Sequence, residues 1–233
     1  MSSTEDISQF GYTPYSNREE FCFIEGESGL VYPGVRIENI SFPLSISAVQ
    51  AAVCSCLANK DRPVMLFQPG NKSELSDYWI EEFNLKFSES FPESPNLYNP
   101  IHPIPEDPVY ELNSLCKQAV TIHSNFPVSA LLIINKGSIH GVNVEVEAWS
   151  LGLCAERVAL SRALAAGINQ FERMHVAAPK SEFCSPCGAC RQVLNEMMPK
   201  SMIYLHHDNR SVSKHFAEHL LPHGFTSGSL KNR

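Results

Sequence analysis

The hydrophobic positions in the second half of the chain switch between helical spacing and continuous apolar runs. Residues 109–120 carry apolar side chains at helical spacing and predict a helix. The run 126–134 is rich in branched side chains and predicts a strand. Residues 135–137 are a hairpin turn signal, so residues 139–145 are expected to form the returning strand.

The pattern continues with alternating helices and strands. A helix is expected from Cys154 to the residue before Gly167, because glycine commonly follows the last turn of a helix. Strands are expected at 174–178 and 201–206, a helix with Pro186 in its first turn between them, and a last helix at 212–221. Strands joined by crossover helices predict an α/β sandwich with helices on both faces of a mixed sheet.

The first half of the chain repeats part of this pattern. Residues 34–53 align with residues 141–160 without a gap, and Gly, Val, Glu, Leu and two Ala coincide while most other apolar positions stay apolar. A strand is expected at 64–67 and a helix at 77–85. An internal repeat of this length predicts two copies of one structural unit.

Prolines separate the two copies. The stretch 88–108 contains closely spaced prolines, which oppose helix and central strand and favour an extended path. We therefore predict a first domain at 15–90, a linker at 91–108 and a second domain at 109–233.

Composition narrows the class of protein. The 233 residues are 43% hydrophobic and carry a net charge of −7, and the acidic excess disfavours binding to nucleic acid. No apolar run is long enough to span a membrane, and no signal peptide is evident after Met1, so a cytoplasmic protein is expected. A reduced compartment also suits the eight cysteines, five of which lie mostly in apolar runs: Cys22, Cys54, Cys56, Cys116 and Cys184.

The other three cysteines predict a metal site. Cys187 and Cys190 lie within one helical turn, and Cys154 opens another expected helix. Helix N-termini favour thiolates, and catalytic zinc sites use three protein ligands with an open fourth position. Glu156 lies two residues from Cys154, where its carboxylate could act as an acid and base beside the metal, and Arg157 could offset part of the thiolate charge.

Each of these residues also has a simpler interpretation. A lone pair of cysteines at this spacing also fits a redox pair or half of a structural zinc site. Cys154 alone could be a core residue, and Glu156 alone could be a solvated helix residue.

The motifs together resemble the cytidine deaminase family. The resemblance rests on Cys154-Ala-Glu-Arg157 and Ser185-Pro-Cys-Gly-Ala-Cys-Arg-Gln-Val193, with Phe126-Pro-Val upstream, Gly141-Val-Asn-Val-Glu145 next and Leu220-Leu-Pro-His-Gly-Phe225 near the end. The pairing of an upstream Cys/Glu segment with a downstream cysteine pair is also a described signature of zinc deaminases.

The resemblance implies an activity and a set of site residues. It implies hydrolytic deamination of cytidine and deoxycytidine in pyrimidine salvage, with one Zn²⁺ per chain. It implies that Glu156 accepts a proton from the attacking water and returns protons to the ring nitrogen and the leaving ammonia. The substrate-binding residues that it implies are Phe126, Asn143, Val144, Glu145 and Phe225.

The first copy lacks this chemistry. Ser47 stands where Cys154 stands in the second copy, and Val49 stands where Glu156 stands. The fold class that we predict is α/β, with two tandem cytidine-deaminase-like three-layer α/β/α domains, each with a mixed sheet, of which the first holds no zinc. A homodimer of two-domain chains is expected.

Other functions stay open at this point. One alternative is a deaminase of a related cytosine nucleotide or nucleoside antibiotic, and another is a zinc-containing scaffold without catalysis. A deaminase that edits RNA or DNA would need a basic groove, which the acidic composition disfavours. The histidines late in the chain are expected to be surface residues on the last helix rather than a second metal site: His206, His207, His215, His219 and His223.

Overall fold

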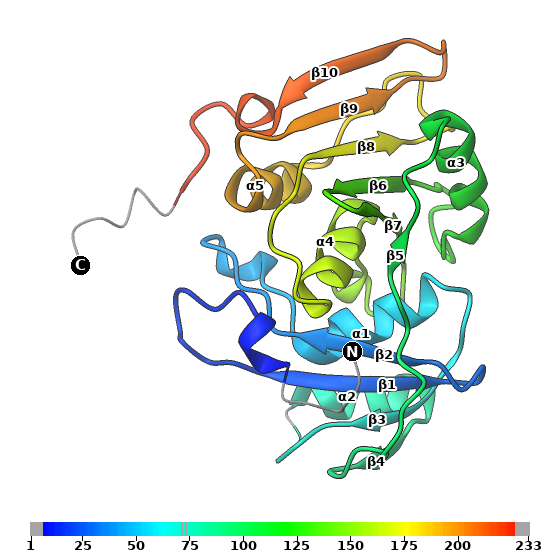
Figure 1. The fold of residues 1–233 in the computed structure, drawn as a ribbon, viewed down its shortest axis with the longest axis vertical. Coiled ribbons are helices and arrows are strands. Elements are labelled where there is room, and N and C mark those ends of the chain that lie inside the picture. The colour runs from blue at the N-terminus through cyan, green and yellow to red at the C-terminus, as the bar shows by residue number, and fades with distance from the viewer. Residues whose placement is uncertain (1–6, 71, 73, 227–233) are drawn as a thin grey trace.

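Two β-sheets with helices between them make up the computed structural model, which describes residues 7–70, 72 and 74–226. Figure 1 shows one sheet at each end of the molecule, with helices α1 and α4 in the space between the sheets. The linker from the first to the second half runs along the side of both sheets (Figure 1).

The first half builds a four-stranded sheet. Its strands are ordered β2-β1-β3-β4, with β1 antiparallel to both of its neighbours and β3 parallel to β4. The elements, in chain order, are β1 (Phe21–Gly26), β2 (Val31–Val35), α1 (Ala48–Leu57), β3 (Pro63–Phe67), α2 (Glu74–Phe83) and β4 (Lys86–Ser88).

The second half builds a six-stranded sheet around the same pattern. Its strands are ordered β10-β9-β8-β6-β7-β5, with β6 antiparallel to β7 and β8, and β8 parallel to β9. The elements are β5 (Ile101–His102), α3 (Pro108–Leu115), β6 (Ser129–Ile134), β7 (Gly137–Val142), α4 (Ala155–Ala165), β8 (Arg173–Ala177), α5 (Gly188–Met197), β9 (Met202–His206) and β10 (Val212–Phe216).

The glycine that the two copies of the repeat share at equivalent positions has a structural cause. A Cβ added to Gly34 would lie 2.2 Å from the carbonyl oxygen of Ala48 on α1, and one added to Gly141 would lie 2.1 Å from that of Ala155 on α4. Strand and helix backbones therefore touch at the same place in both halves. Only glycine permits so close an approach.

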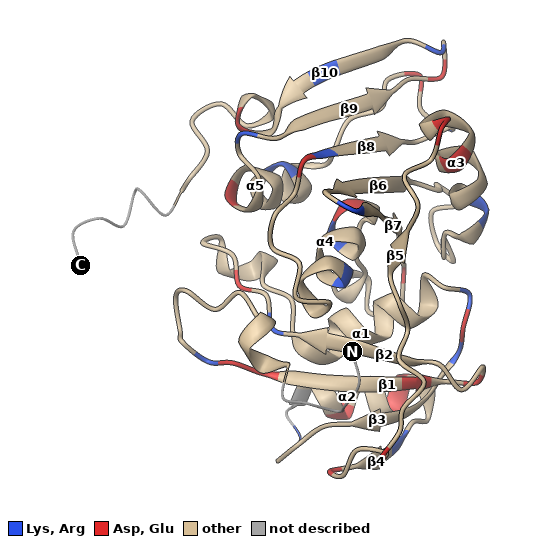
Figure 2. Ribbon diagram, in the orientation of Figure 1, with Lys and Arg blue, Asp and Glu red and all other residues tan. Residues whose placement is uncertain are grey.

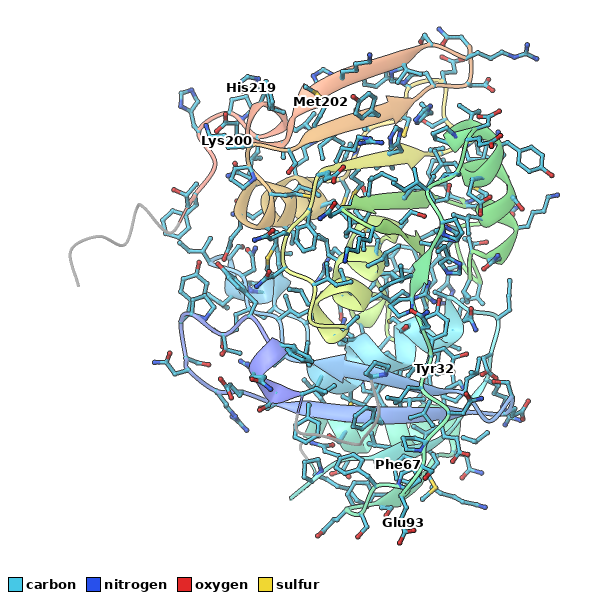
Figure 3. All side chains as sticks on the ribbon, in the orientation of Figure 1. Tyr32, Phe67, Glu93, Lys200, Met202 and His219 are labelled. Atoms are coloured by element: carbon cyan, nitrogen blue, oxygen red, sulfur yellow. The ribbon has the colours of Figure 1, made fainter. Side chains whose placement is uncertain are left out.

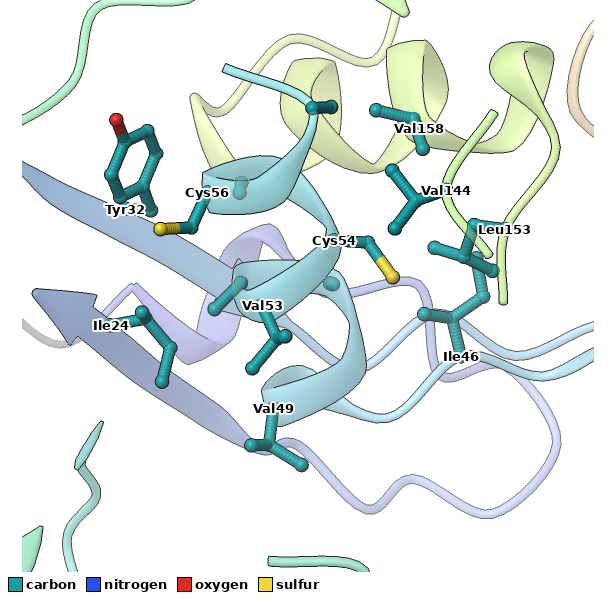
Figure 4. Packing of buried hydrophobic residues seen from close by; sticks show 14 of the residues in the cluster. Ile24, Tyr32, Ile46, Val49, Val53, Cys54, Cys56, Val144, Leu153 and Val158 are labelled. Atoms are coloured by element: carbon teal, nitrogen blue, oxygen red, sulfur yellow. The ribbon is translucent and has the colours of Figure 1, made fainter. Parts of the chain in front are cut away.

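The two halves share one hydrophobic core. A single cluster of buried residues includes Ile24 and Val53 from the first half and Val144, Leu153 and Val158 from the second. In Figure 4, the side chain of Cys54 on α1 points toward Val144 and Leu153, while Val53 and Val49 lie toward Ile24 of β1. A second cluster lies between the larger sheet and helices α4 and α5.

The fold class is confirmed, with three local corrections. The predicted helix at 212–221 is wrong, because Val212–Phe216 pairs with β9 as an antiparallel edge strand and only Ala217–Leu220 forms a short 3-10 helix. Pro186 precedes α5 instead of entering its first turn, because Cys187 is the N-cap residue. Within the predicted linker, Ile101–His102 forms β5 and pairs with β7.

Charged residues are spread over the whole fold. Figure 2 shows basic and acidic segments interspersed on both sheets and their connections. Figure 3 places the labelled Tyr32 and Phe67 on the four-stranded sheet and Lys200 and Met202 at the opposite end of the molecule. None of the helices among the described residues is long and apolar enough to cross a membrane.

Candidate metal centre and active site

The first turns of α4 and α5 bring the three predicted thiols together. Cys154 is the N-cap residue of α4 and Cys187 is the N-cap residue of α5, both with extended backbone conformation. Cys190 lies one turn into α5 and is fully buried. The strands that precede α4 and α5 are β7 and β8, and both run antiparallel to β6. Both helices therefore begin at the same end of the sheet.

The thiol geometry fits a tetrahedral metal ion. The sulfur atoms of Cys154, Cys187 and Cys190 all lie within 4.8 Å of one another, and those of Cys154 and Cys187 are 3.7 Å apart. Two sulfurs bound at ~2.3 Å to a tetrahedral zinc ion would be separated by about 3.8 Å. This is the one group of three or more potential metal ligands found among the described residues.

The pKa values of the thiols indicate how the cluster carries negative charge. The neighbouring thiols of Cys154 and Cys190 hydrogen-bond to Cys187 and lower its pKa, and backbone N–H groups of Cys190 and Ala189 add to the effect. The pKa of Cys154 is raised to about 12, first by its contact with Cys187, because the thiolate charge settles on Cys187. A divalent cation at the centre of the three sulfurs would favour thiolates at all of them.

Glu156 is placed beside this cluster on the first turn of α4. Its side chain is only 3% exposed, and burial raises its pKa from 4.5 to about 7. The nearby Cys187 contributes to this rise in pKa, while Arg157 opposes it. A carboxyl group with a pKa near neutrality can both accept and donate a proton at physiological pH.

The cluster and Glu156 share one cavity. It has a volume of about 370 Å³ and is lined by Cys154, Cys187 and Glu156 together with three large aromatic side chains, Phe126, Trp149 and Phe183. The size is that of a pocket for a small organic ligand. Aromatic walls around a few polar groups suit a flat, partly polar molecule.

Asn143 and Glu145 line the same cavity and also hold its wall. Asn143 Oδ1 accepts a hydrogen bond from the N–H of Val128 at 2.7 Å, and Nδ2 donates to the carbonyl of Phe126 at 3.0 Å. Glu145 accepts hydrogen bonds from the N–H groups of His123 and Ser124 and from the Ser124 hydroxyl. These bonds lower the pKa of Glu145 against the opposing effect of burial, which is the largest single influence.

Besides the fully buried Cys190, three predicted site residues do not line this cavity. The side chain of Val144 is buried in the shared core, and its backbone exchanges two hydrogen bonds with Leu153, next to Cys154. Phe225 is half exposed, and its carbonyl accepts a hydrogen bond from Gln192. Arg157 is buried and donates to the carbonyl of Leu44 in the first half at 2.9 Å.

Phe183 is a lining residue that the motifs did not indicate. It lies four residues before Cys187, and its ring stacks on His207 with centroids 4.6 Å apart. His207 Nδ1 also accepts a hydrogen bond from the N–H of Cys184. The available signal in the sequence was an aromatic residue shortly before the cysteine pair. The direction of the Phe183 ring, however, depends on its stacking with His207, which follows β9.

Three thiols and a buried carboxylate at two helix starts on one mixed sheet form the arrangement of a zinc-dependent deaminase. Residues 109–206 match the family described as "Cytidine and deoxycytidylate deaminase zinc-binding region". Cytidine deaminase of Sporosarcina psychrophila is 39% identical over 116 residues, which cover 49% of this chain and 85% of that protein. The chain therefore belongs to the cytidine deaminase family, and zinc is the metal that this family binds at such a cluster.

Other relatives also match about half of the chain. Cytidine deaminase of Mycoplasma genitalium is 34% identical over 119 residues, which cover 50% of this chain and 92% of that protein. The crystal structure of cytidine deaminase from Burkholderia pseudomallei matches with a TM-score of 0.48 and 36% identity, covering 50% of this chain and 95% of that structure.

Proposed function

We propose that this protein is a cytidine deaminase that hydrolyses cytidine and deoxycytidine to uridine and deoxyuridine with release of ammonia. One zinc ion per chain would be held by Cys154, Cys187 and Cys190, with Glu156 as the catalytic acid and base. The observation that carries the proposal is the buried carboxylate of Glu156 in the same cavity as the three-thiol cluster.

Proton transfer is the role that the position of Glu156 supports. When bound, zinc supplies Lewis acidity that makes water a nucleophile near neutral pH. Glu156 would accept the proton of the attacking water and donate it to N3 of the cytosine ring. It would then take the remaining proton of the added hydroxyl group and give it to the amino group, which leaves as ammonia. Its elevated pKa suits both directions of transfer, because neither form is strongly favoured near pH 7.

The sugar-binding role of Asn143 and Glu145 is compatible with the bonds that they already make. An ionised carboxylate offers about four acceptor positions, of which Glu145 uses three in the wall of the cavity. Asn143 uses one of its two amide hydrogens for Phe126. One acceptor and one donor thus remain for ribose hydroxyl groups, while Phe126 offers an apolar face to the ring.

We also propose that the first half is a degenerate copy of the catalytic domain. Its strands β1 to β4 repeat the order and direction of β6 to β9. Glu38 accepts from the N–H groups of Tyr15 and Ser16, as Glu145 does from His123 and Ser124. Ser47 is the N-cap residue of α1, where its hydroxyl accepts from the N–H of Gln50 instead of binding metal.

A homodimer in the cytoplasm, acting in pyrimidine salvage, completes the proposal. Phe225 lies outside the cavity of its own chain and is half exposed, so it is available to the cavity of a second chain. A salvage role follows from the substrates alone, because deamination returns free cytosine nucleosides to the uridine pool.

The direct test is turnover and metal content measured on the same purified sample. We expect cytidine and deoxycytidine to be converted, followed by ultraviolet absorbance, with about one zinc per chain by elemental analysis. The nucleotides CMP and dCMP serve as comparison substrates, and a preference for them would replace the nucleoside assignment by the nucleotide alternative. Stoichiometric zinc without turnover of any of the four would favour the scaffold alternative.

A further inference from the structure

One wall of the cavity is held in place by the half of the chain that carries no thiol cluster. The wall is the turn at residues 146–151, here called the Trp149 turn, which includes a 3-10 helix at Trp149–Leu151. The hydroxyl of Tyr78 on α2 accepts a hydrogen bond from the N–H of Ala148 at 3.2 Å. The side-chain amide of Gln50 on α1 donates to the carbonyl of Leu151 at 2.9 Å.

These two bonds bracket the tryptophan. Trp149 lies between Ala148 and Leu151, lines the cavity, and is 64% exposed. Within its own half, the indole meets the ring of His123 edge-on at a centroid distance of 5.7 Å. The other bonds of the turn come from its own half: Leu151 to Ala148, Gly152 to Trp149, and the ring nitrogen of His123 to the carbonyl of Val146 at 3.3 Å. Such a short turn is expected to depend on outside contacts for its orientation.

The burial of the Gln50 and Tyr78 side chains makes their hydrogen bonds to the Trp149 turn specific. Gln50 is only 6% exposed, so its amide would lose a hydrogen bond without replacement by bulk water if the turn moved. Tyr78 is half-buried between α2 and the turn. The side chain of Leu151 packs against the core that the two halves share, so the turn also rests on that core.

We propose that Tyr78 and Gln50 are positioning residues of the active site, through which the first half sets Trp149 as a wall for the nucleoside. This inference rests on the proposed function. The first half thus contributes to substrate binding without touching the substrate. Its effect is expected in KM, because it orders a binding surface and does not reach Glu156 or the thiols.

The test uses variants of the full-length protein that remove single hydrogen bonds. Tyr78→Phe deletes only the hydroxyl group, and Gln50→Met keeps the size of the side chain. For each we expect KM for cytidine to rise about three- to tenfold, the loss typical of one hydrogen bond, with kcat within about twofold of wild type. Tyr110→Phe is the matched control, because Tyr110 is 74% exposed on α3, away from the turn.

Tryptophan fluorescence reports the position of the turn independently of turnover. The chain has two tryptophans, and Trp79 is fully buried, so a quencher such as acrylamide reports mainly on Trp149. We expect quenching to change in Tyr78→Phe and Gln50→Met and to stay at the wild-type value in Tyr110→Phe.

The outcomes separate this inference from the proposed function. Unchanged KM and unchanged quenching in both variants would overturn the positioning role, as would a fall in melting temperature with KM unchanged. If the wild-type protein converts no cytosine nucleoside, the proposed function fails. A comparison of acrylamide quenching between the wild-type protein and the variants Tyr78→Phe and Gln50→Met still decides whether these hydrogen bonds place Trp149.

Discussion

Gln50 and Arg157 occupy equivalent positions of the repeat, and each donates a hydrogen bond to a backbone carbonyl in the opposite half. Gln50 bonds to Leu151 and Arg157 bonds to Leu44, both at 2.9 Å. The two leucines are themselves repeat equivalents: Leu151 packs against the core cluster that the halves share, and Leu44 packs against the cluster of the second half. The halves therefore meet through a pseudo-two-fold contact, like two subunits joined in one chain.

The shared core predicts that the second half is not stable alone. A fragment of residues 109–233 would expose Val144, Leu153 and Val158, which are buried against the first half. We expect it to aggregate or to pair with a second fragment, because an exposed apolar surface of this kind seeks a partner. Light scattering after size-exclusion chromatography measures this, and a folded monomer with a cooperative thermal transition would contradict the prediction.

Replacement of Glu156 by Gln is expected to abolish proton transfer while leaving the metal site intact. The amide keeps the shape of the side chain, and it removes the carboxyl group that we propose as acid and base. We expect kcat to fall by about 10²–10⁴-fold or more. Zinc content should equal that of the wild-type protein, and substantial turnover by a zinc-loaded variant would refute the role of Glu156.

Loss of any of the three clustered thiols is expected to release the metal. In Cys190→Ala, two sulfurs remain, and a site with two protein ligands binds zinc far more weakly than one with three. We expect less than about a tenth of the wild-type zinc content and a matching loss of activity. Cys22→Ala is the control, since Cys22 is buried in the first half and lies outside the cluster.

Treatment with a chelator should reproduce that loss reversibly. The wild-type protein is expected to lose activity with its zinc and to recover both when zinc is added back, because the thiols are supplied by a preformed pair of helix starts. Failure of added zinc to restore activity, in protein that remains folded by circular dichroism, would count against a catalytic metal.

A methyl group at Gly141 is expected to push α4 off the sheet. The new Cβ would lie 2.1 Å from the carbonyl oxygen of Ala155, a backbone atom that moves only with the helix. We expect Gly141→Ala to lower the free energy of unfolding by about 2–3 kcal/mol, as overpacking does. Zinc affinity should fall too, since Ala155 is next to Cys154. Gly188→Ala is the control, because an added Cβ there meets no atom within 4 Å.

The histidine stack at β5 and β7 predicts sensitivity to acid. The rings of His102 and His140 stack with centroids 4.0 Å apart. The pKa of His140 is lowered from 6.5 to about 3, chiefly by burial and also by the nearby His102 and Arg162. Glu111 lies 3.8 Å from the His140 ring and favours the charged form, but burial and the two neighbours dominate.

The sign of the effect follows from proton binding. A histidine whose pKa is lower in the folded protein binds its proton more readily when unfolded, so stability is lost as pH falls from about 6.5 toward 3. Between pH 6.5 and 4, we expect His140→Gln to reduce this loss by about 3 kcal/mol relative to wild type. Chemical denaturation of the metal-free proteins measures it, with the surface histidine variant His219→Gln as control. Equal pH dependence in all three would contradict the prediction.

Much of the fold was predictable because local patterns coincide with burial. The turn at 135–137 does join β6 to β7, and the helix begun at Cys154 does end before Gly167, which has a φ of +76°. The edge strand Val212–Phe216 was not predictable from the sequence. Its side chains alternate between exposed and half-buried because the segment pairs with β9, a neighbour that no local pattern indicates. At these residues, pairing with the neighbouring strand outweighs the local helix propensity.

The sequence by itself determined the family, the repeat and the residues able to bind metal, because thiols at fixed spacings and glycine–alanine contacts are local requirements. Only the tertiary structure decided which side chains share the cavity. It placed Phe183 and Trp149 there, buried Val144 in the core and brought Tyr78 and Gln50 of the first half to the Trp149 turn. The physical reason is that such contacts depend on the packing of two halves that are far apart in sequence, and no local pattern carries that information.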